Sequence, residues 1–122
     1  MALNPVTGLA LGRVAIGVGS FAAPPLAMQM FRLDPVSNPQ LAFMSRMFGS
    51  REVALGALTL ATRGKTQRNL VLAGIAVDAA DAVTGQLVAR EGTVTKATGM
   101  FLTLPALGAV AAGVAGLVLR RR

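Results

Sequence analysis

Six ionisable side chains lie within stretches of the sequence that are otherwise apolar enough to cross a membrane. A charge at the centre of a bilayer costs roughly 2.5–3.5 kcal/mol even on lenient insertion scales, so such residues usually face protein or a water-filled cavity. Three of the six are basic and three are acidic, so their formal charges cancel. The six residues are Arg13, Arg46, Arg51, Glu52, Asp78 and Asp81.

The spacing of these residues indicates which of them meet. Asp78 and Asp81 are three residues apart and therefore share a helix face. At a rise of about 1.5 Å per residue, five of the six fall in one layer near the middle of the bilayer, and the remaining arginine lies nearer the outer interface. We expect Arg51 to contact the face that carries Asp78 and Asp81, and Arg13 to pair with Glu52 or Asp78.

Two roles for this layer follow from its chemistry. A balanced set of buried charges would neutralise itself in an ion-pair network that fixes the register of the helices. The same side chains would otherwise form a polar site for ions, protons or lipid headgroups, which is the usual role of charge inside a membrane.

A catalytic role is not predicted. Asp78 and Asp81, with Ala89-Arg90 downstream, resemble part of the DxxDGxxAR motif of CDP-alcohol phosphotransferases, whose carboxylates hold a divalent metal against a pyrophosphate. Ala82 stands in place of the glycine, the Ala-Arg is displaced, and no second Asp pair follows. The chain also has no Cys and no His, which excludes thiol chemistry and the common zinc sites. We expect no catalytic residue, no metal and no cofactor.

The composition is that of a small integral membrane protein. Of the 122 residues, 53% are hydrophobic and 14% are charged, whereas soluble domains have about 25% charged residues. The net charge of +7 comes largely from clusters that adjoin apolar segments, where signals of membrane topology belong. We therefore expect no nucleic-acid partner.

Four apolar segments predict an all-α, antiparallel four-helix bundle that forms a single membrane domain over residues 1–122. Asn4 and Pro5 are suited to begin the first helix, and Pro24-Pro25 breaks or kinks it. The short loops make successive helices antiparallel neighbours. The expected helices are 5–23 with a kinked or interfacial extension over 24–32, 40–62, 69–89 and 97–119.

The basic residues also predict the orientation. The expected loop 63–68 and the C-terminal Arg120–Arg122 run are more basic than the two opposite loops, which places both termini in the cytoplasm. The usage of Ala, Gly, Val and Arg is typical of a high-GC bacterium, so the expected location is the bacterial plasma membrane.

Rows of small residues on the first and last helices are candidate packing faces. Gly8 and Gly12 form a GxxxG pair, and Gly108, Ala112 and Gly116 form a second row. Such rows let helix backbones approach closely in lipid. They would pack inside the bundle or dock on a partner protein.

Several short motifs stand close together in the chain, namely Arg46-Met47-Phe48-Gly49, Arg51-Glu52, Ala54-Leu55-Gly56 and the stretch DAADAVTG over 78–85. With these motifs the chain resembles small four-span membrane proteins of actinobacteria. It is also similar to the accessory membrane subunits of mycobacterial cell-entry lipid importers. These resemblances imply a multi-pass location, membrane lipids as surroundings and a transporter permease as partner.

The function that these observations predict is that of a non-catalytic accessory or scaffolding subunit of a larger membrane complex, a lipid transporter above all. The alternative is a small carrier or proton-linked channel that uses the intramembrane charges.

Overall fold

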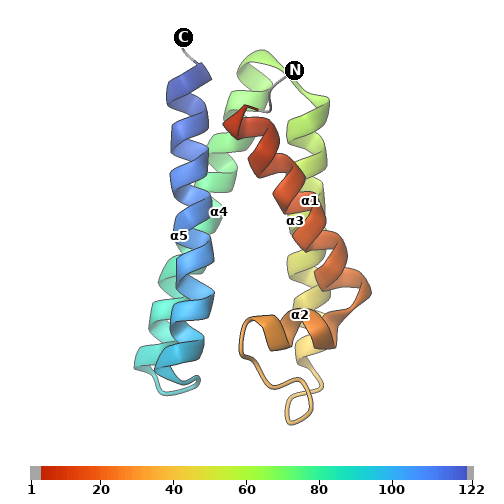
Figure 1. Ribbon diagram of the computed structural model, residues 1–122, viewed down its shortest axis with the longest axis vertical. Helices are drawn as coiled ribbons and strands as arrows, with labels where there is room; N and C mark the ends of the chain where they lie inside the picture. The colour runs from red at the N-terminus through yellow and green to blue at the C-terminus, as the bar shows by residue number, and fades with distance from the viewer. Residues whose placement is uncertain (1–3, 121–122) are drawn as a thin grey trace.

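The computed structural model describes residues 4–120, and within them it contains five α-helices and no strand (Figure 1). The expectation of an all-α chain is thus confirmed. The helices are α1 (Pro5–Ala22), α2 (Pro24–Met30), α3 (Leu41–Ala61), α4 (Gly64–Arg90) and α5 (Lys96–Arg120).

Local sequence signals set the ends of α1 and α2. The Asn4 side chain accepts a hydrogen bond from the backbone N–H of Thr7, and Pro5 occupies the first helical position. Ala23 interrupts the helix before Pro24 begins α2. The expected extension after the kink is therefore a separate seven-residue helix.

The expected loop over 63–68 is wrong, because α4 already begins at Gly64. The Gln67 side chain donates hydrogen bonds of 2.9 and 3.0 Å to the backbone carbonyls of Thr59 and Thr62 at the end of α3. Carbonyls at the end of a helix lack the backbone N–H donors of a following turn, so the polar first turns of α4 also help to cap α3. The polar residues that indicated a loop are consistent with a solvated helix end.

The buried stripe on each of the first three long helices consists of small and charged residues rather than large apolar ones. On α1 this stripe follows a spacing of three and four residues, as expected for one helix face. Ser20 and Ser45 are the largest fully buried side chains of the described chain, whereas many Leu, Phe and Met side chains are exposed. The buried residues of α1 are Val6, Ala10, Arg13, Gly17 and Ser20.

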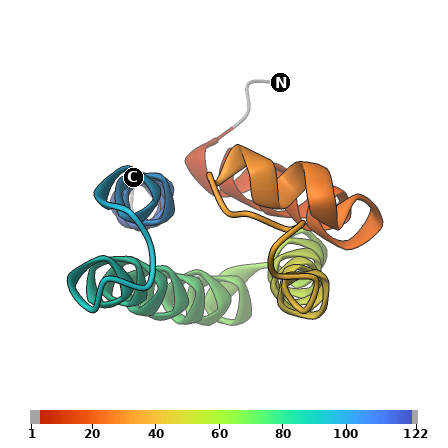
Figure 2. The ribbon, with the colours of Figure 1, turned by 90° about the horizontal axis from the view of Figure 1, so that it is seen from below.

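The helices pack mainly in two pairs, α1 with α3 and α4 with α5 (Figures 1 and 2). Glycines allow the close approach in each pair. A Cβ atom added at Gly17 would lie 2.7 Å from the carbonyl oxygen of Gly49, and one added at Gly99 would lie 2.6 Å from the Cβ of Ala89. The pairs contact each other near the end that holds both termini, where Gly116 of α5 lies against Val6 of α1.

Three of the described helices are long and apolar enough to cross a membrane, namely α1, α4 and α5 as far as Leu119. The sequence predicts four spans. The fourth candidate, α3, has 21 residues but carries Arg46, Arg51 and Glu52, and it does not qualify by composition.

Candidate functional site

Arg13 of α1 lies at the centre of a buried ion-pair network. Its Nη1 atom donates hydrogen bonds to Oε2 of Glu52 at 2.8 Å and to Oδ1 of Asp78 at 3.1 Å, and its Nη2 atom donates to Oδ2 of Asp78 at 2.5 Å. These residues are 7%, 4% and 2% exposed, respectively. Arg13 was expected to meet one of the two carboxylates, and it binds both, so that it joins α1, α3 and α4.

Two glycines make room for this arginine. A Cβ atom added at Gly74 of α4 would lie 2.7 Å from Nη2 of Arg13. One added at Gly56 of α3 would lie 2.6 Å from the carbonyl oxygen of Ala10 on α1. Gly74 therefore leaves space for the guanidinium, and Gly56 lets α3 approach α1 beside it. Neither glycine was predicted from the sequence, although each lies four residues from a carboxylate of the network, on the same helix face.

Arg51 and Asp81 form a second, more accessible pair between α3 and α4. Nη2 and Nη1 of Arg51 donate to the two carboxylate oxygens of Asp81 at 2.5 and 3.4 Å. The two side chains are 36% and 32% exposed. Arg51 also lies 3.7 Å from Glu52 and over the ring of Phe48, 5.1 Å from its centroid. The expected contact between Arg51 and the Asp78/Asp81 face is thus formed, through Asp81.

Arg46 does not join these residues. Its Nε atom donates to the backbone carbonyl of Phe21 at 3.2 Å, in an exposed position. The expected network of six residues therefore has five members in the structure. We call these five, Arg13, Arg51, Glu52, Asp78 and Asp81, the charged cluster. Two guanidinium groups and three carboxylates give the cluster a formal charge of −1, whereas the six residues together would be neutral.

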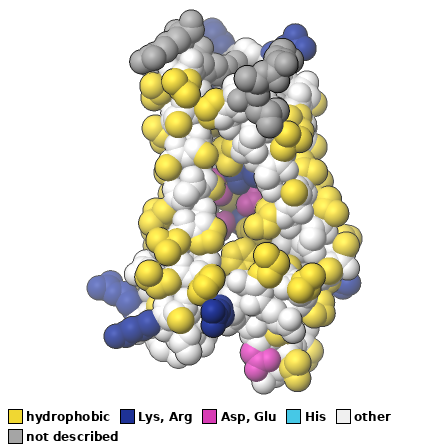
Figure 3. Space-filling view, in the orientation of Figure 1, with side chains coloured by type: hydrophobic (Ala, Val, Ile, Leu, Met, Phe, Trp, Pro, Cys, Tyr) yellow, Lys and Arg dark blue, Asp and Glu magenta, His cyan; other side chains and the backbone are white. Residues whose placement is uncertain are grey.

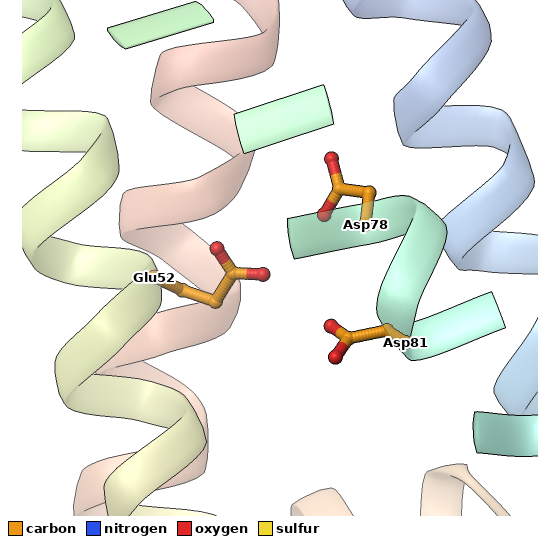
Figure 4. Close-up of side chains that lie close together, drawn as sticks. All are labelled: Glu52, Asp78 and Asp81. Carbon is orange, nitrogen blue, oxygen red and sulfur yellow. The ribbon is translucent and has the colours of Figure 1, made fainter. Parts of the chain in front are cut away.

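The three carboxylates of the charged cluster converge on one place. Glu52 points from α3 toward Asp78 and Asp81 on α4 (Figure 4), and ligand oxygens of the three lie within 4.8 Å of one another. Carboxylate oxygens are ligands for hard cations. Each of these carboxylates already forms an ion pair with an arginine, however. In the structure they therefore bind the two guanidinium groups.

The charged cluster lines a cavity of about 910 Å³ between the two helix pairs. The walls are mainly apolar and come from four helices, with side chains such as Ile16, Met28, Phe48 and Leu102. The charged groups are visible deep between these walls in Figure 3, where the cavity opens on the face of the molecule between α5 and α1. A polar base under apolar walls is suited to an amphipathic ligand. No pattern in the sequence indicated this cavity.

The candidate packing glycines occupy several environments. Gly8, Gly12 and Ala112 line the cavity, and a Cβ added at either glycine would meet nothing within 4 Å. Gly108 is exposed, and a Cβ there would also meet nothing within 4 Å. Of the four glycines in the set, Gly116 is the one in a tight helix contact, because a Cβ there would lie 2.7 Å from the Val6 side chain.

Comparison with known proteins adds no functional assignment, because no protein-family model, curated protein or solved structure matches the chain.

Proposed function

We propose that the protein crosses the bacterial plasma membrane four times, through α1, α3, α4 and α5. The charges of α3 are compatible with a span because each has a partner. Arg51 and Glu52 belong to the charged cluster, and Arg46 donates to a backbone carbonyl near the end of α1. Paired charges that face other helices are the form in which such residues are tolerated in membranes.

Both termini are proposed to lie in the cytoplasm. The end of the bundle that holds the termini carries six basic residues and no acidic one, whereas the opposite loops carry three basic and two acidic residues, a net +6 against +1. Cytoplasmic loops are enriched in Lys and Arg. Arg121 and Arg122 lie outside the described residues, so their charge enters from the sequence alone. The basic residues are Arg63, Lys65, Arg68 and Arg120–Arg122 at one end and Arg32, Arg90 and Lys96 at the other, with Asp34 and Glu91.

Within the membrane, the protein acts as a non-catalytic, lipid-binding accessory subunit of a larger complex, a lipid transporter. The observation that carries this proposal is the cavity with apolar walls and a charged base. Its volume, about 910 Å³, lies within the range of about 300–1,000 Å³ that is usual for small-molecule sites. A cavity that opens sideways from a bundle in a bilayer faces acyl chains, so its natural occupant is a lipid.

The outer surface of α5 supports the accessory role. Gly108 is exposed, with open space above its Cα atom, next to the exposed apolar residues Leu104 and Leu107. An exposed small residue on an apolar helix lets a second transmembrane helix approach closely. The resemblance to accessory subunits of lipid importers agrees with this placement.

Affinity purification from native membranes in mild detergent tests the accessory role. The tagged protein should copurify with a larger complex that includes a permease. Gly108→Leu should reduce the yield of this complex, whereas Gly19→Leu, at an exposed glycine of α1 with equally open surroundings, should leave it unchanged. A monodisperse small homo-oligomer without a larger partner would contradict the proposal.

A small carrier or proton-linked channel is the second candidate, and the accessibility of Asp81 favours it. This carboxylate is 32% exposed and lines the cavity, so it could exchange a proton or a cation with a transported solute. Asp81→Asn should then abolish flux in proteoliposomes while the protein still accumulates in the membrane. Under the accessory function, the purified protein alone supports no flux.

A further inference from the structure

The charged cluster holds one negative charge more than its arginines neutralise. Among the described residues, the ion pairs of its three carboxylates involve Arg13 and Arg51 and no other cation. Arg46, which would complete the balance, lies at Phe21 instead. An uncompensated charge in the interior of a membrane protein is costly, so the cluster is electrostatically matched to one additional positive charge.

The excess charge is accessible from the cavity at Asp81. Arg13, Glu52 and Asp78 are buried, whereas about a third of the Asp81 side chain is exposed. Among residues 4–120, Arg51 is the side chain that donates to the Asp81 carboxylate, and a carboxylate has about four acceptor positions. Asp81 can therefore accept a further donor without losing its arginine.

The surroundings of Asp81 indicate what kind of cation fits. A divalent metal ion would turn the cluster from −1 to +1, and its hydration shell would face the apolar walls of the cavity. An anionic headgroup would make the total charge of the cluster and its ligand −2. A lipid headgroup that ends in an ammonium group places a positive charge at the base. Its phosphate leaves the headgroup neutral overall, so the lipid adds no net negative charge, and its acyl chains match the apolar character of the walls.

We propose that the cavity binds a lipid whose headgroup carries a primary ammonium group, such as phosphatidylethanolamine. The ammonium donates a hydrogen bond to Asp81 at the base of the cavity, and the acyl chains lie along the walls that include Ile16, Met28 and Leu102. This inference rests on the proposed lipid-binding function and adds the headgroup.

The test uses the purified full-length protein in nanodiscs that contain equal amounts of phosphatidylethanolamine, phosphatidylcholine and phosphatidylglycerol, followed by native mass spectrometry of the retained lipid. Phosphatidylethanolamine should be enriched over phosphatidylglycerol by about tenfold, a factor within the reach of one charge-assisted hydrogen bond. It should also exceed phosphatidylcholine, because the choline headgroup has no N–H donor. Asp81→Asn should remove the preference, and Asp34→Asn, in an exposed loop outside the cavity, should keep it.

The possible outcomes separate this inference from the proposed function. Retained lipid with equal occupancy of the three headgroups overturns the headgroup assignment and leaves lipid binding intact. Absence of any retained lipid overturns both. The comparison of phosphatidylethanolamine with phosphatidylcholine uses the wild-type protein alone, so it decides the question even if Asp81→Asn fails to fold.

Discussion

Arg13 and Asp78 are joined by two hydrogen bonds, of 3.1 and 2.5 Å, although they lie 65 positions apart in the sequence and on different helix pairs. The link is buried and runs across the division between α1/α3 and α4/α5. The pair formed by Arg51 and Asp81 crosses the same division next to the cavity. The two Arg–Asp pairs therefore fix how the helix pairs are placed around the cavity.

Arg13→Ala is expected to destabilise the protein by about 3–5 kcal/mol, because it leaves buried carboxylates without a partner. Arg51→Ala should destabilise the protein less, since Arg51 and Asp81 are each about one-third exposed and exposed ion pairs contribute little to stability. Denaturant titration in detergent, followed by circular dichroism, measures both. A larger loss for Arg51→Ala would contradict this ranking.

The pairing itself is tested by a double-mutant cycle. The combined change Arg13→Ala with Asp78→Ala should cost less than the sum of the two single changes, because the two groups are in direct contact. Additive losses would mean that the interaction does not contribute to folding.

Gly17→Ala should destabilise the protein by about 1–3 kcal/mol through overpacking, because the added Cβ would lie 2.7 Å from the carbonyl oxygen of Gly49. Gly12→Ala on the same helix should cause no loss, since its Cβ would meet nothing within 4 Å. Thermal unfolding of the two variants in the same detergent is the measurement. Equal losses of stability in the two variants would contradict the idea that Gly17 is needed for the close approach of α1 and α3.

Cysteine accessibility checks the orientation, and the absence of native cysteine simplifies it. A cysteine at exposed Thr66 should react with a membrane-impermeant maleimide only after the cells are opened, because this end carries the excess of basic residues. A cysteine at exposed Thr93, in the loop between α4 and α5, should react in intact cells. The reverse pattern would invert the proposed topology.

The loop after α2 should respond to acid. The hydroxyl and backbone N–H of Ser37, together with the N–H of Val36, donate to Asp34 and hold the pKa of this carboxyl below its ordinary value. Because the pKa is lowered in the folded state, the turn is stabilised above the ordinary pKa, and the stabilisation is lost as the pH falls through the lowered value. The protection of the Val36 and Ser37 backbone amides against hydrogen exchange should therefore fall as the pH drops through the lowered pKa of Asp34. In Asp34→Asn this protection should depend less on pH.

Much of the ion pairing could be predicted from the sequence, because depth in a helix follows from the residue count and short loops make neighbouring helices antiparallel. The depth of Arg46, outside the midplane layer, was predicted, but its hydrogen bond to the Phe21 carbonyl was not, since the direction of its side chain depends on how α3 rotates against α1. The role of Gly8 and Gly12 depends on the same rotation. They lie off the buried stripe that includes Ala10, Arg13 and Gly17, so a GxxxG spacing alone did not identify the face on which α1 packs.

The cavity could not be predicted, because it results from the divergence of two helix pairs rather than from any local pattern. Helix lengths and apolar periodicity indicate that four helices associate. They do not indicate whether the two helix pairs pack against each other along their full length or leave a space between them. Gly74 illustrates the same limit, since its need for a small side chain arises from Arg13 of another helix.

Native mass spectrometry of the protein after release from its own membrane tests the central claim that a lipid occupies this cavity. The wild-type protein should retain one lipid, and Gly12→Leu should lose it, because the new side chain projects into the cavity without meeting the protein. Gly19→Leu, which lies on the same helix outside the cavity, should retain it. Equal lipid retention by Gly12→Leu and the wild-type protein, or no lipid on the wild-type protein, would contradict the account.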